Sequence, residues 1–144
     1  MIDKNLKIEI TEVFSSPVSK VWSALTDKEK VKQYFYGTEV TSTWKPGSDI
    51  VFSGEWDGKA YEDKGKIIEI MNEKLIKYSY FSSFSGLPDL PENYGIITYQ
   101  LKSLDSGTEL KVTQEGFKDE KAWSNSKNGW KFVIENLKKL LNSE

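Results

Sequence analysis

The sequence has no cysteine and no histidine among its 144 residues. A chain without cysteine has no disulfide, no thiol nucleophile and no iron–sulfur cluster, and a chain without histidine lacks the usual zinc ligands and the base of a Ser-His-Asp triad. Oxygen-only clusters with the spacing of a calcium loop are missing too. These absences exclude most common hydrolase chemistries, and we expect no metal, no cofactor and no assigned catalytic residue.

Excess charge of either sign is also missing. There are 20 lysines, no arginine and 22 acidic residues, which leaves a net charge of −2. The lysines are scattered among the acids, so the sequence has no basic patch and we expect no nucleic-acid partner. No stretch approaches the roughly 18 apolar residues of a membrane span, and residues 1–4 lack the apolar run of a signal peptide. We therefore expect a cytoplasmic protein that does not insert into membranes.

The apolar content favours a folded chain. Hydrophobic residues make up 38% of the sequence and aromatic residues 13%. At this length the chain has room for one ordinary domain, and a domain of this size buries roughly two-thirds of the surface that its unfolded chain exposes. We expect a single domain over residues 1–144.

The N-terminal third predicts one strand and two short helices. Apolar and charged side chains alternate over residues 6–14, which is the two-residue period of a half-buried strand. Ser16 before Pro17 has the signature of an N-cap followed by the first helical position. Thr26 and Glu29 have the spacing of a capping box. We therefore expect a kinked pair of helices after the first strand.

The middle of the chain has the turn signals of successive hairpins, between runs rich in β-branched and aromatic residues. We predict six further strands, arranged as a meander: 38–44, 48–56, 59–70, 74–82, 94–103 and 108–117. The one long connection, residues 83–93, contains Phe84, Leu87 and Leu90. A loop of this length is often functional, so it is either a mobile lid or a fixed cap on one end of the core.

A long amphipathic helix ends the sequence. Acidic residues at 119–120 and lysines at 138–139 are placed to complement a helix dipole. At about 100° per residue, one stripe of this helix is apolar. It comprises Trp123, Trp130, Val133, Ile134, Leu137, Leu140 and Leu141. Phe132 lies on the polar side and breaks the pattern.

Specific motifs accompany this order of elements. The segment from Pro17 to Asp27 resembles the opening helix of START-like (SRPBCC) domains. Later segments resemble successive motifs of one subfamily: Trp44-Lys45-Pro46-Gly47, Gly65-Lys66-Ile67-Ile68-Glu69-Ile70, Gly107-Thr108-Glu109-Leu110 and Gly129-Trp130. The sequence is therefore similar, over nearly its whole length, to the activator of 90-kDa heat-shock protein ATPase homologue-like family.

The resemblance implies an α+β helix-grip fold. In that fold a curved, mostly antiparallel sheet of about seven strands, in the order β-α-α-β6-α, wraps around the C-terminal helix and encloses a cavity. Members of the wider group include lipid carriers, plant hormone receptors, cyclases and bacterial proteins. The eukaryotic co-chaperone has an additional N-terminal domain that makes much of its chaperone contact, and this sequence has no counterpart. We therefore do not expect a heat-shock protein as the main partner.

The candidate site is the space between the inner face of the sheet and the last helix. Its candidate ligand-binding residues are Tyr34, Phe35, Phe52, Trp56, Tyr61, Tyr78, Tyr80, Phe84, Leu87, Tyr99, Trp123, Trp130, Val133 and Leu137. Each of these side chains also fits an ordinary core, because aromatic residues at strand or helix spacing are usually just buried. Gly129 and Trp130 fit close packing of the helix on the sheet at least as well as ligand contact.

Three functions are open at this point. The first is binding of a hydrophobic or amphipathic small molecule, such as a lipid or a polyketide-like or flavonoid-like aromatic, in that cavity. The second is a cyclase or dehydratase in which a cavity tyrosine or glutamate moves protons. The carboxylates in predicted strands are Glu39, Asp49, Glu55, Asp63 and Glu69, of which Glu55 and Glu69 are the two to watch. The third is a stress-related chaperone adaptor that acts through the outer surface.

Overall fold

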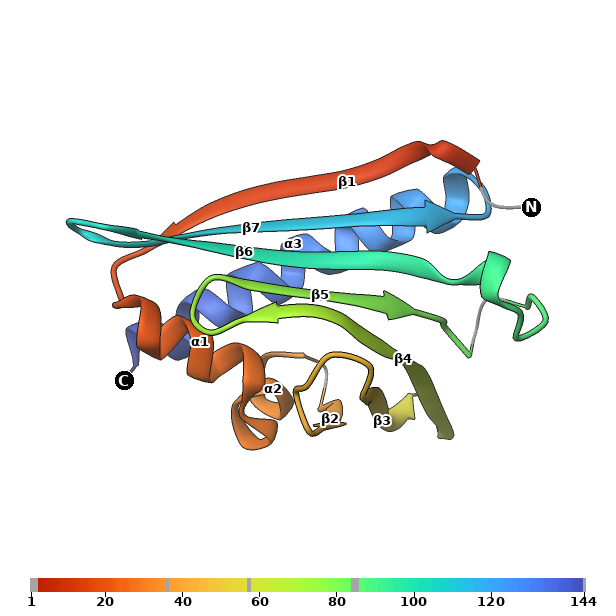
Figure 1. Cartoon of the computed structure of the whole chain (residues 1–144), viewed down its shortest axis with the longest axis horizontal. Helices are drawn as coiled ribbons and strands as arrows, with labels where there is room; N and C mark the ends of the chain where they lie inside the picture. The colour runs from red at the N-terminus through yellow and green to blue at the C-terminus, as the bar shows by residue number, and fades with distance from the viewer. Residues whose placement is uncertain (1–2, 36, 57, 84–85, 144) are drawn as a thin grey trace.

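The computed structural model describes residues 3–35, 37–56, 58–83 and 86–143, without the side chains of residues 3, 4 and 56 (Figure 1). Along the chain lie β1 (Asp3–Phe14), α1 (Val18–Thr26), α2 (Lys28–Tyr34), β2 (Glu39–Ser42), β3 (Asp49–Trp56), β4 (Lys59–Met71), β5 (Leu75–Tyr80), a 3-10 turn (Pro91–Asn93), β6 (Gly95–Leu104), β7 (Gly107–Phe117) and α3 (Glu120–Asn142). Within these ranges no helix is long and apolar enough to cross a membrane.

The seven strands form one antiparallel sheet in the order β1-β7-β6-β5-β4-β3-β2. The helices α1 and α2 carry the chain from the β1 edge to the β2 edge, and the remaining strands return as a meander. Figure 1 shows α3 running across one face of the sheet, with α1 and α2 beside its C-terminal half. The predicted helix-grip fold, with a curved sheet around the last helix, is confirmed.

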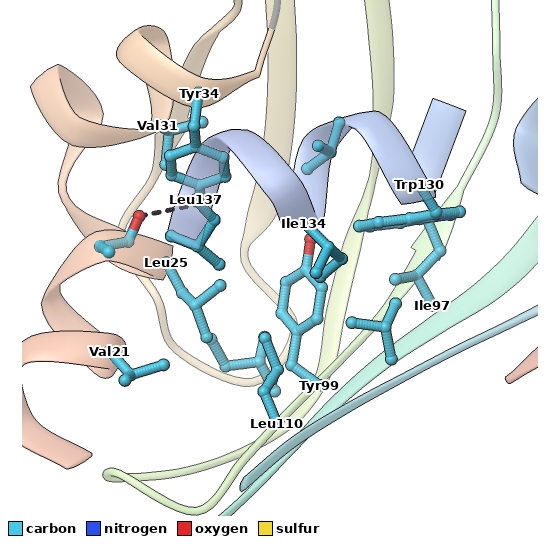
Figure 2. Packing of buried hydrophobic residues seen from close by; sticks show 14 of the residues in the cluster. Val21, Leu25, Val31, Tyr34, Ile97, Tyr99, Leu110, Trp130, Ile134 and Leu137 are labelled. Carbon is cyan, nitrogen blue, oxygen red and sulfur yellow. Dashed lines mark hydrogen bonds between the residues drawn. The ribbon is translucent and has the colours of Figure 1, made fainter. Parts of the chain in front are cut away.

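The core lies between α3 and the inner face of the sheet. The apolar stripe of α3 turns Trp130, Val133 and Leu137 onto the sheet, where all three are buried. In Figure 2 the indole of Trp130 lies close to Ile97 and to the ring of Tyr99. Burial of each such large apolar side chain stabilises the fold by roughly 1.5–3 kcal/mol. Phe132 is 52% exposed, as its place on the polar side of the helix predicts.

The start of α1 differs from the prediction by one residue. Pro17 is the N-cap, with an extended ψ of 159°, and the helix begins at Val18. The carbonyl oxygen of Ser16 accepts a 2.9 Å hydrogen bond from the hydroxyl of the buried Thr108 on β7. A residue before proline also favours extended backbone. Ser16 therefore ties the helix to the sheet and does not cap the helix.

The capping box predicted for α2 is also wrong. Asp27 is the N-cap, and its carboxylate accepts a 2.9 Å hydrogen bond from the backbone N–H of Glu29. The Thr26 hydroxyl donates to the carbonyl oxygen of Trp22 in the preceding helix. The side chains of Asp27 and Thr26 each form a local hydrogen bond. The N-cap of α2 is Asp27, one residue later than the spacing of Thr26 and Glu29 predicts, because Thr26 still belongs to α1.

The sheet bends within β4. The first part of this strand pairs with β3 as far as Lys66, and the part from Ile67 onward pairs with β5. A Cβ atom at Gly65 would lie 1.6 Å from the carbonyl oxygen of Ser79, so only glycine allows the two backbones to approach this closely. A register irregularity follows between Ile67 and Glu69. The bend curls the strands around α3 and leaves space on the concave side.

Candidate functional site

A partly open pocket of about 540 Å³ lies between α3 and the concave face of the sheet. Side chains from five strands and from α3 line it, together with two residues between α2 and β2. The lining residues are Phe35, Thr38, Phe52, Tyr61, Asp63, Tyr78, Tyr80, Ile97, Gln114, Ser126, Gly129, Trp130 and Val133. Small-molecule sites usually have volumes of about 300–1,000 Å³ and mostly apolar walls with a few placed polar groups. This pocket has both properties.

Five aromatic rings form a closed circuit against the pocket. Trp130 meets Phe35 edge-on at 6.0 Å, Phe35 lies 6.3 Å from Phe52, and Phe52 lies 5.7 Å from Tyr78. Tyr78 contacts Tyr99 at 5.9 Å, and Tyr99 returns edge-on to Trp130 at 6.0 Å. Aromatic pairs in these geometries each contribute about 0.5–1.5 kcal/mol beyond the area that they bury. Each of the five rings therefore contacts two others of the circuit.

One buried hydrogen bond joins α3 to β7 at this wall. The indole Nε1 of Trp130 donates to Oε1 of Gln114 over 2.6 Å. An indole nitrogen only donates, so it fixes the orientation of the amide and leaves the Gln114 amino group as a donor. Gln114 is buried and lines the pocket. The pocket therefore has one fixed amide donor between its helix and its sheet.

Asp63 is the carboxylate that the sheet turns inward. It is 8% exposed, and its Oδ2 accepts a 2.6 Å bond from the Tyr80 hydroxyl. Its Oδ1 accepts from the backbone N–H and the hydroxyl of Ser83, at 2.8 and 2.9 Å. Three donors stabilise the carboxylate. Burial, and then the charge of Asp63, hold the pKa of Tyr80 well above its ordinary value, so the phenol keeps its proton.

Two more hydroxyls meet at another part of the pocket. Tyr61 and Thr38 share a short hydrogen bond between their hydroxyl oxygens. The ring of Tyr61 crosses over its cross-strand partner Gly54, where a Cβ atom would lie 2.7 Å from the phenol oxygen. Glycine at this position makes room for the ring, which brings its hydroxyl to Thr38.

The deeper tyrosines are fully buried. The hydroxyls of Tyr78 and Tyr99 lie 3.2 Å apart, and that of Tyr34 donates to the Ala24 carbonyl oxygen over 2.9 Å, which ties α2 to α1 (Figure 2). Burial raises the pKa of Tyr99 to about 12 and raises those of Tyr78 and Tyr34 well above the ordinary value. These phenols stay neutral at any physiological pH and act only as neutral donors and acceptors.

The structure brings seven of the fourteen candidate residues to this pocket: Phe35, Phe52, Tyr61, Tyr78, Tyr80, Trp130 and Val133. Tyr34 and Tyr99 border a small adjoining space of about 10 Å³. Leu137 is 1% exposed in the core. Contact of any of them with a ligand stays a prediction.

Four candidates do not line the pocket or are not described. The indole of Trp123 donates a 2.9 Å bond to the carbonyl oxygen of Lys7 at the β1 edge, two turns away from Trp130. Leu87 lines a different hollow. The side chain of Trp56 and the whole of Phe84 lie outside the described residues. The expectation of two indoles at the cavity is therefore wrong for Trp123.

Six lining residues were not among the fourteen: Thr38, Asp63, Ile97, Gln114, Ser126 and Gly129. Glu55 and Glu69, the two carboxylates to watch, are exposed, whereas Asp63 is buried. The alternation along β4 contains the missed signal, since Tyr61, Asp63 and Ile67 occupy one face. Gly129 lines the pocket next to Trp130.

The loop at 83–93 is attached to the rest of the protein at two points of its described part, Ser83 and Asp89. Asp63 holds Ser83, and the Lys64 ammonium lies 2.5 Å from the carboxylate of Asp89. Asp89 also accepts a 2.6 Å bond from the hydroxyl of Tyr94. Asp63 and Lys64 are adjacent in β4 and point to opposite faces of the strand, and both hold the loop. Movement of the loop as a lid remains a prediction.

Known proteins share this architecture. The family model of Activator of Hsp90 ATPase homolog 1-like protein matches residues 15–142. The solution structure of ChR145 from Cytophaga hutchinsonii is 43% identical in sequence, with a TM-score of 0.83 over 99% of this chain and 97% of that one. No curated protein matches significantly.

More distant structures share the fold. Protein MLL2253 from Mesorhizobium loti is 21% identical, with a TM-score of 0.79 over 95% of this chain and 97% of that one. DynU16, from the dynemicin biosynthetic locus, is 18% identical, with a TM-score of 0.78 over 95% of this chain and 47% of that one. The family match spans most of the sequence, including the helix and strands that build the pocket. The chain belongs to the Activator of Hsp90 ATPase homolog 1-like protein family.

Proposed function

We propose that this protein binds a hydrophobic or amphipathic small molecule in the pocket between α3 and the sheet. The observation that carries the proposal is a space of about 540 Å³ against a circuit of aromatic rings. Protein interiors are close-packed and have few voids larger than a water molecule. A pocket of this size is the property of a binding protein more than of a core that merely stabilises the fold.

The walls favour a ligand with an aromatic or otherwise flat apolar body. Phe35, Phe52 and Trp130 offer ring faces and edges, and such contacts supply apolar burial together with preferred geometry. The polar groups are few, and among them the Gln114 amide and the Tyr80 and Tyr61 hydroxyls are held by hydrogen bonds. A lipid or a polyketide-like or flavonoid-like aromatic fits this chemistry. That a protein of the same fold comes from the dynemicin biosynthetic locus agrees with a small-molecule role.

The pair of Asp63 and Tyr80 is what favours the alternative of a cyclase or dehydratase. A carboxylate beside a phenol in a pocket is the arrangement expected for proton transfer. Here, however, the oxygens of Asp63 are already occupied by three hydrogen bonds from Tyr80 and Ser83, and the raised pKa of Tyr80 makes its phenol a weak acid. Both groups are better suited to orient a bound molecule than to move its protons. Binding without reaction is therefore the leading function.

The test is ligand titration of a pocket-filling variant and a matched control. Gly129→Leu places a side chain in the pocket, whereas Asn128→Leu adds the same side chain at an exposed position of the same helix. The probes are a flavonoid, an anthraquinone and palmitate, measured by calorimetry. We expect saturable binding of at least one probe by the native protein and by Asn128→Leu, and an affinity lower by about tenfold or more for Gly129→Leu.

The same variant separates lost binding from lost folding. Leucine is a better helix former than glycine by roughly 0.5–1 kcal/mol, so Gly129→Leu should not lower the midpoint of thermal unfolding. Equal affinity of the three proteins for a probe would show that the probe binds elsewhere. No binding of any probe by the native protein would contradict the proposed function.

A further inference from the structure

A second hollow lies next to the pocket and differs from it in chemistry. Its volume is about 600 Å³, and it shares Tyr80, Gln114 and Ser126 with the lining of the pocket. Two of these three side chains are held in place, Tyr80 by Asp63 and Gln114 by Trp130. Ser126, on α3, is the smallest of the three. The two spaces therefore meet along a short boundary, and its smallest side chain is a serine.

The lining of the second hollow is more polar than that of the pocket, although apolar surface still makes up more than half of it. The N-terminal turns of α3 contribute Lys121 and Asn125, and Lys118 and Asp119 precede them. Asp119 caps α3 through a 2.8 Å bond from the backbone N–H of Ala122. The charged residues of the lining are thus two lysines and one aspartate, an excess of one positive charge. The lining offers both hydrogen-bond donors and acceptors.

Asn93, at the end of the 3-10 turn, also lines the second hollow and has an unused acceptor. It is 6% exposed, and its Nδ2 donates a 2.9 Å bond to the carbonyl oxygen of Pro88. Its Oδ1 is buried and accepts no hydrogen bond from the residues that the structure describes. An unpaired buried acceptor costs about 1–3 kcal/mol. A rotation of the Asn93 side chain would turn this shielded oxygen into the hollow, where a ligand group that donates a hydrogen bond would remove the cost; an anion does not donate one.

We propose that the pocket and the second hollow form one site for an amphipathic molecule whose polar end is hydroxylated. This inference rests on the proposed function, since the apolar body of the same molecule occupies the pocket. Hydroxyl groups both donate and accept, so they match the Asn93 acceptor together with the Gln114 and Asn125 amides. The ligand passes Ser126, where the two spaces adjoin. The hollow then sets specificity for the head group, and the aromatic pocket sets affinity for the body.

The experiment uses three probes that share or lack the parts of such a ligand. Naphthalene has an apolar body alone, octyl glucoside has a hydroxylated head, and octanoate has an anionic head on a similar tail. We expect the native protein to bind naphthalene, and to bind octyl glucoside about tenfold more tightly than octanoate, below micelle concentrations. Amide NMR of the labelled protein should show the glucoside shifting the side-chain signals of Asn93 and Asn125.

Variants on α3 test the continuity of the site. Ser126→Leu narrows the boundary and should weaken binding of octyl glucoside by about tenfold. Because Ser126 also lines the pocket, binding of naphthalene is measured beside it and should weaken less than binding of the glucoside. Ser124→Leu, exposed on the same helix, is the matched control and should leave both unchanged. Asn125→Ala removes a polar group that lines the second hollow and not the pocket. It should weaken binding of octyl glucoside and leave binding of naphthalene unchanged.

Different outcomes of these experiments would contradict the proposed function and the present inference. If naphthalene, octyl glucoside and octanoate all fail to bind while the flavonoid, the anthraquinone or palmitate binds, only this inference fails; if no probe of either panel binds, both proposals fail. If naphthalene binds while the glucoside is no tighter than octanoate, or is unaffected by Ser126→Leu, only the present inference fails. If octanoate binds more tightly than octyl glucoside and Lys121→Gln weakens its binding, the polar end of the ligand is anionic and not hydroxylated. That result would overturn the inference.

Discussion

The Trp130 indole of α3 and the Gln114 amide of β7 are joined by a 2.6 Å hydrogen bond inside the protein. The two residues come from elements that the fold brings together face to face, and both line the pocket. The bond sets how closely this part of α3 approaches the sheet. It also fixes the orientation of the one amide that faces both spaces.

Removal of the Gln114 amide tests this bond. Gln114→Leu leaves the buried indole N–H without an acceptor, so we expect the free energy of unfolding to fall by about 1–3 kcal/mol. The double variant Trp130→Phe with Gln114→Leu removes both partners and should cost less than the sum of the two single changes. Urea unfolding of the four proteins measures this coupling. Additive effects would mean that the bond contributes nothing.

Asp63→Asn tests the buried carboxylate. The change replaces one acceptor oxygen by an amino group that faces a donor, either Tyr80 or Ser83. We expect a loss of about 1–3 kcal/mol in the free energy of unfolding. The pKa of Tyr80 should fall toward its ordinary value, because the charge of Asp63 is a cause of its elevation, second to burial.

Asp49→Asn is the control for that measurement. Asp49 is exposed and pairs with Lys66 on the outer surface, and its pKa is lowered by that hydrogen bond. Solvent screens such a pair, so urea unfolding should show almost no change. A loss for Asp63→Asn no greater than that for Asp49→Asn would contradict the role given to Asp63.

The buried phenols predict how stability depends on pH. Burial raises the pKa of Tyr99 from 10.0 in the unfolded chain to about 12 in the folded protein. A group with a raised pKa in the folded state contributes its full stabilisation below the unfolded pKa, and the contribution is lost as pH rises through the folded pKa. The free energy of unfolding should therefore fall between pH 10 and 12. Lysines also titrate in this range, so the native protein is compared with Tyr99→Phe, whose free energy of unfolding should fall less steeply with pH. Equal slopes for the two proteins would contradict the assignment of this pH dependence to Tyr99.

Gly65 tests the bend in β4. Gly65→Ala places a methyl group 1.6 Å from the Ser79 carbonyl oxygen, and neither backbone can move without breaking the strand pairing. We expect a loss of about 3 kcal/mol or more in the free energy of unfolding. Gly58→Ala is the control: its φ of 76° is strained for alanine, but nothing lies within 4 Å, so the loss should be about 1 kcal/mol. Equal losses would show that Gly65 is not needed for close approach.

The sequence predicted the order of the elements better than the site. Strong alternation and hairpin turns locate the strands, and the long apolar stripe locates α3. Asp63 was missed because charged strand residues are usually exposed, although Tyr61 and Ile67 place it on the inner face. Only the hydrogen bonds from Ser83 and Tyr80 make its burial possible, and these depend on how the loop returns to the sheet.

Trp123, in contrast, was predicted to lie at the cavity and does not line the pocket. It lies on the same stripe of α3 as Trp130, and helical periodicity alone cannot separate them. The sheet, however, curves and crosses the helix at an angle, so successive turns of one stripe face different strands. Trp130 meets β7 at the pocket, whereas Trp123 meets the backbone of Lys7 on the edge strand. Such a difference depends on the curvature of the whole sheet, which no local pattern encodes.

The central claim is that a ligand binds beside Trp130, and the two indoles of α3 test it within one spectrum. The measurement is a titration of the nitrogen-15 labelled protein with the flavonoid, anthraquinone and palmitate panel, following the indole N–H signals. The account predicts a saturable shift of the Trp130 signal with at least one probe, while the Trp123 signal, bonded to the Lys7 carbonyl oxygen outside the pocket, stays in place. A shift of Trp123 without Trp130, or no shift of Trp130 with any probe, would contradict it.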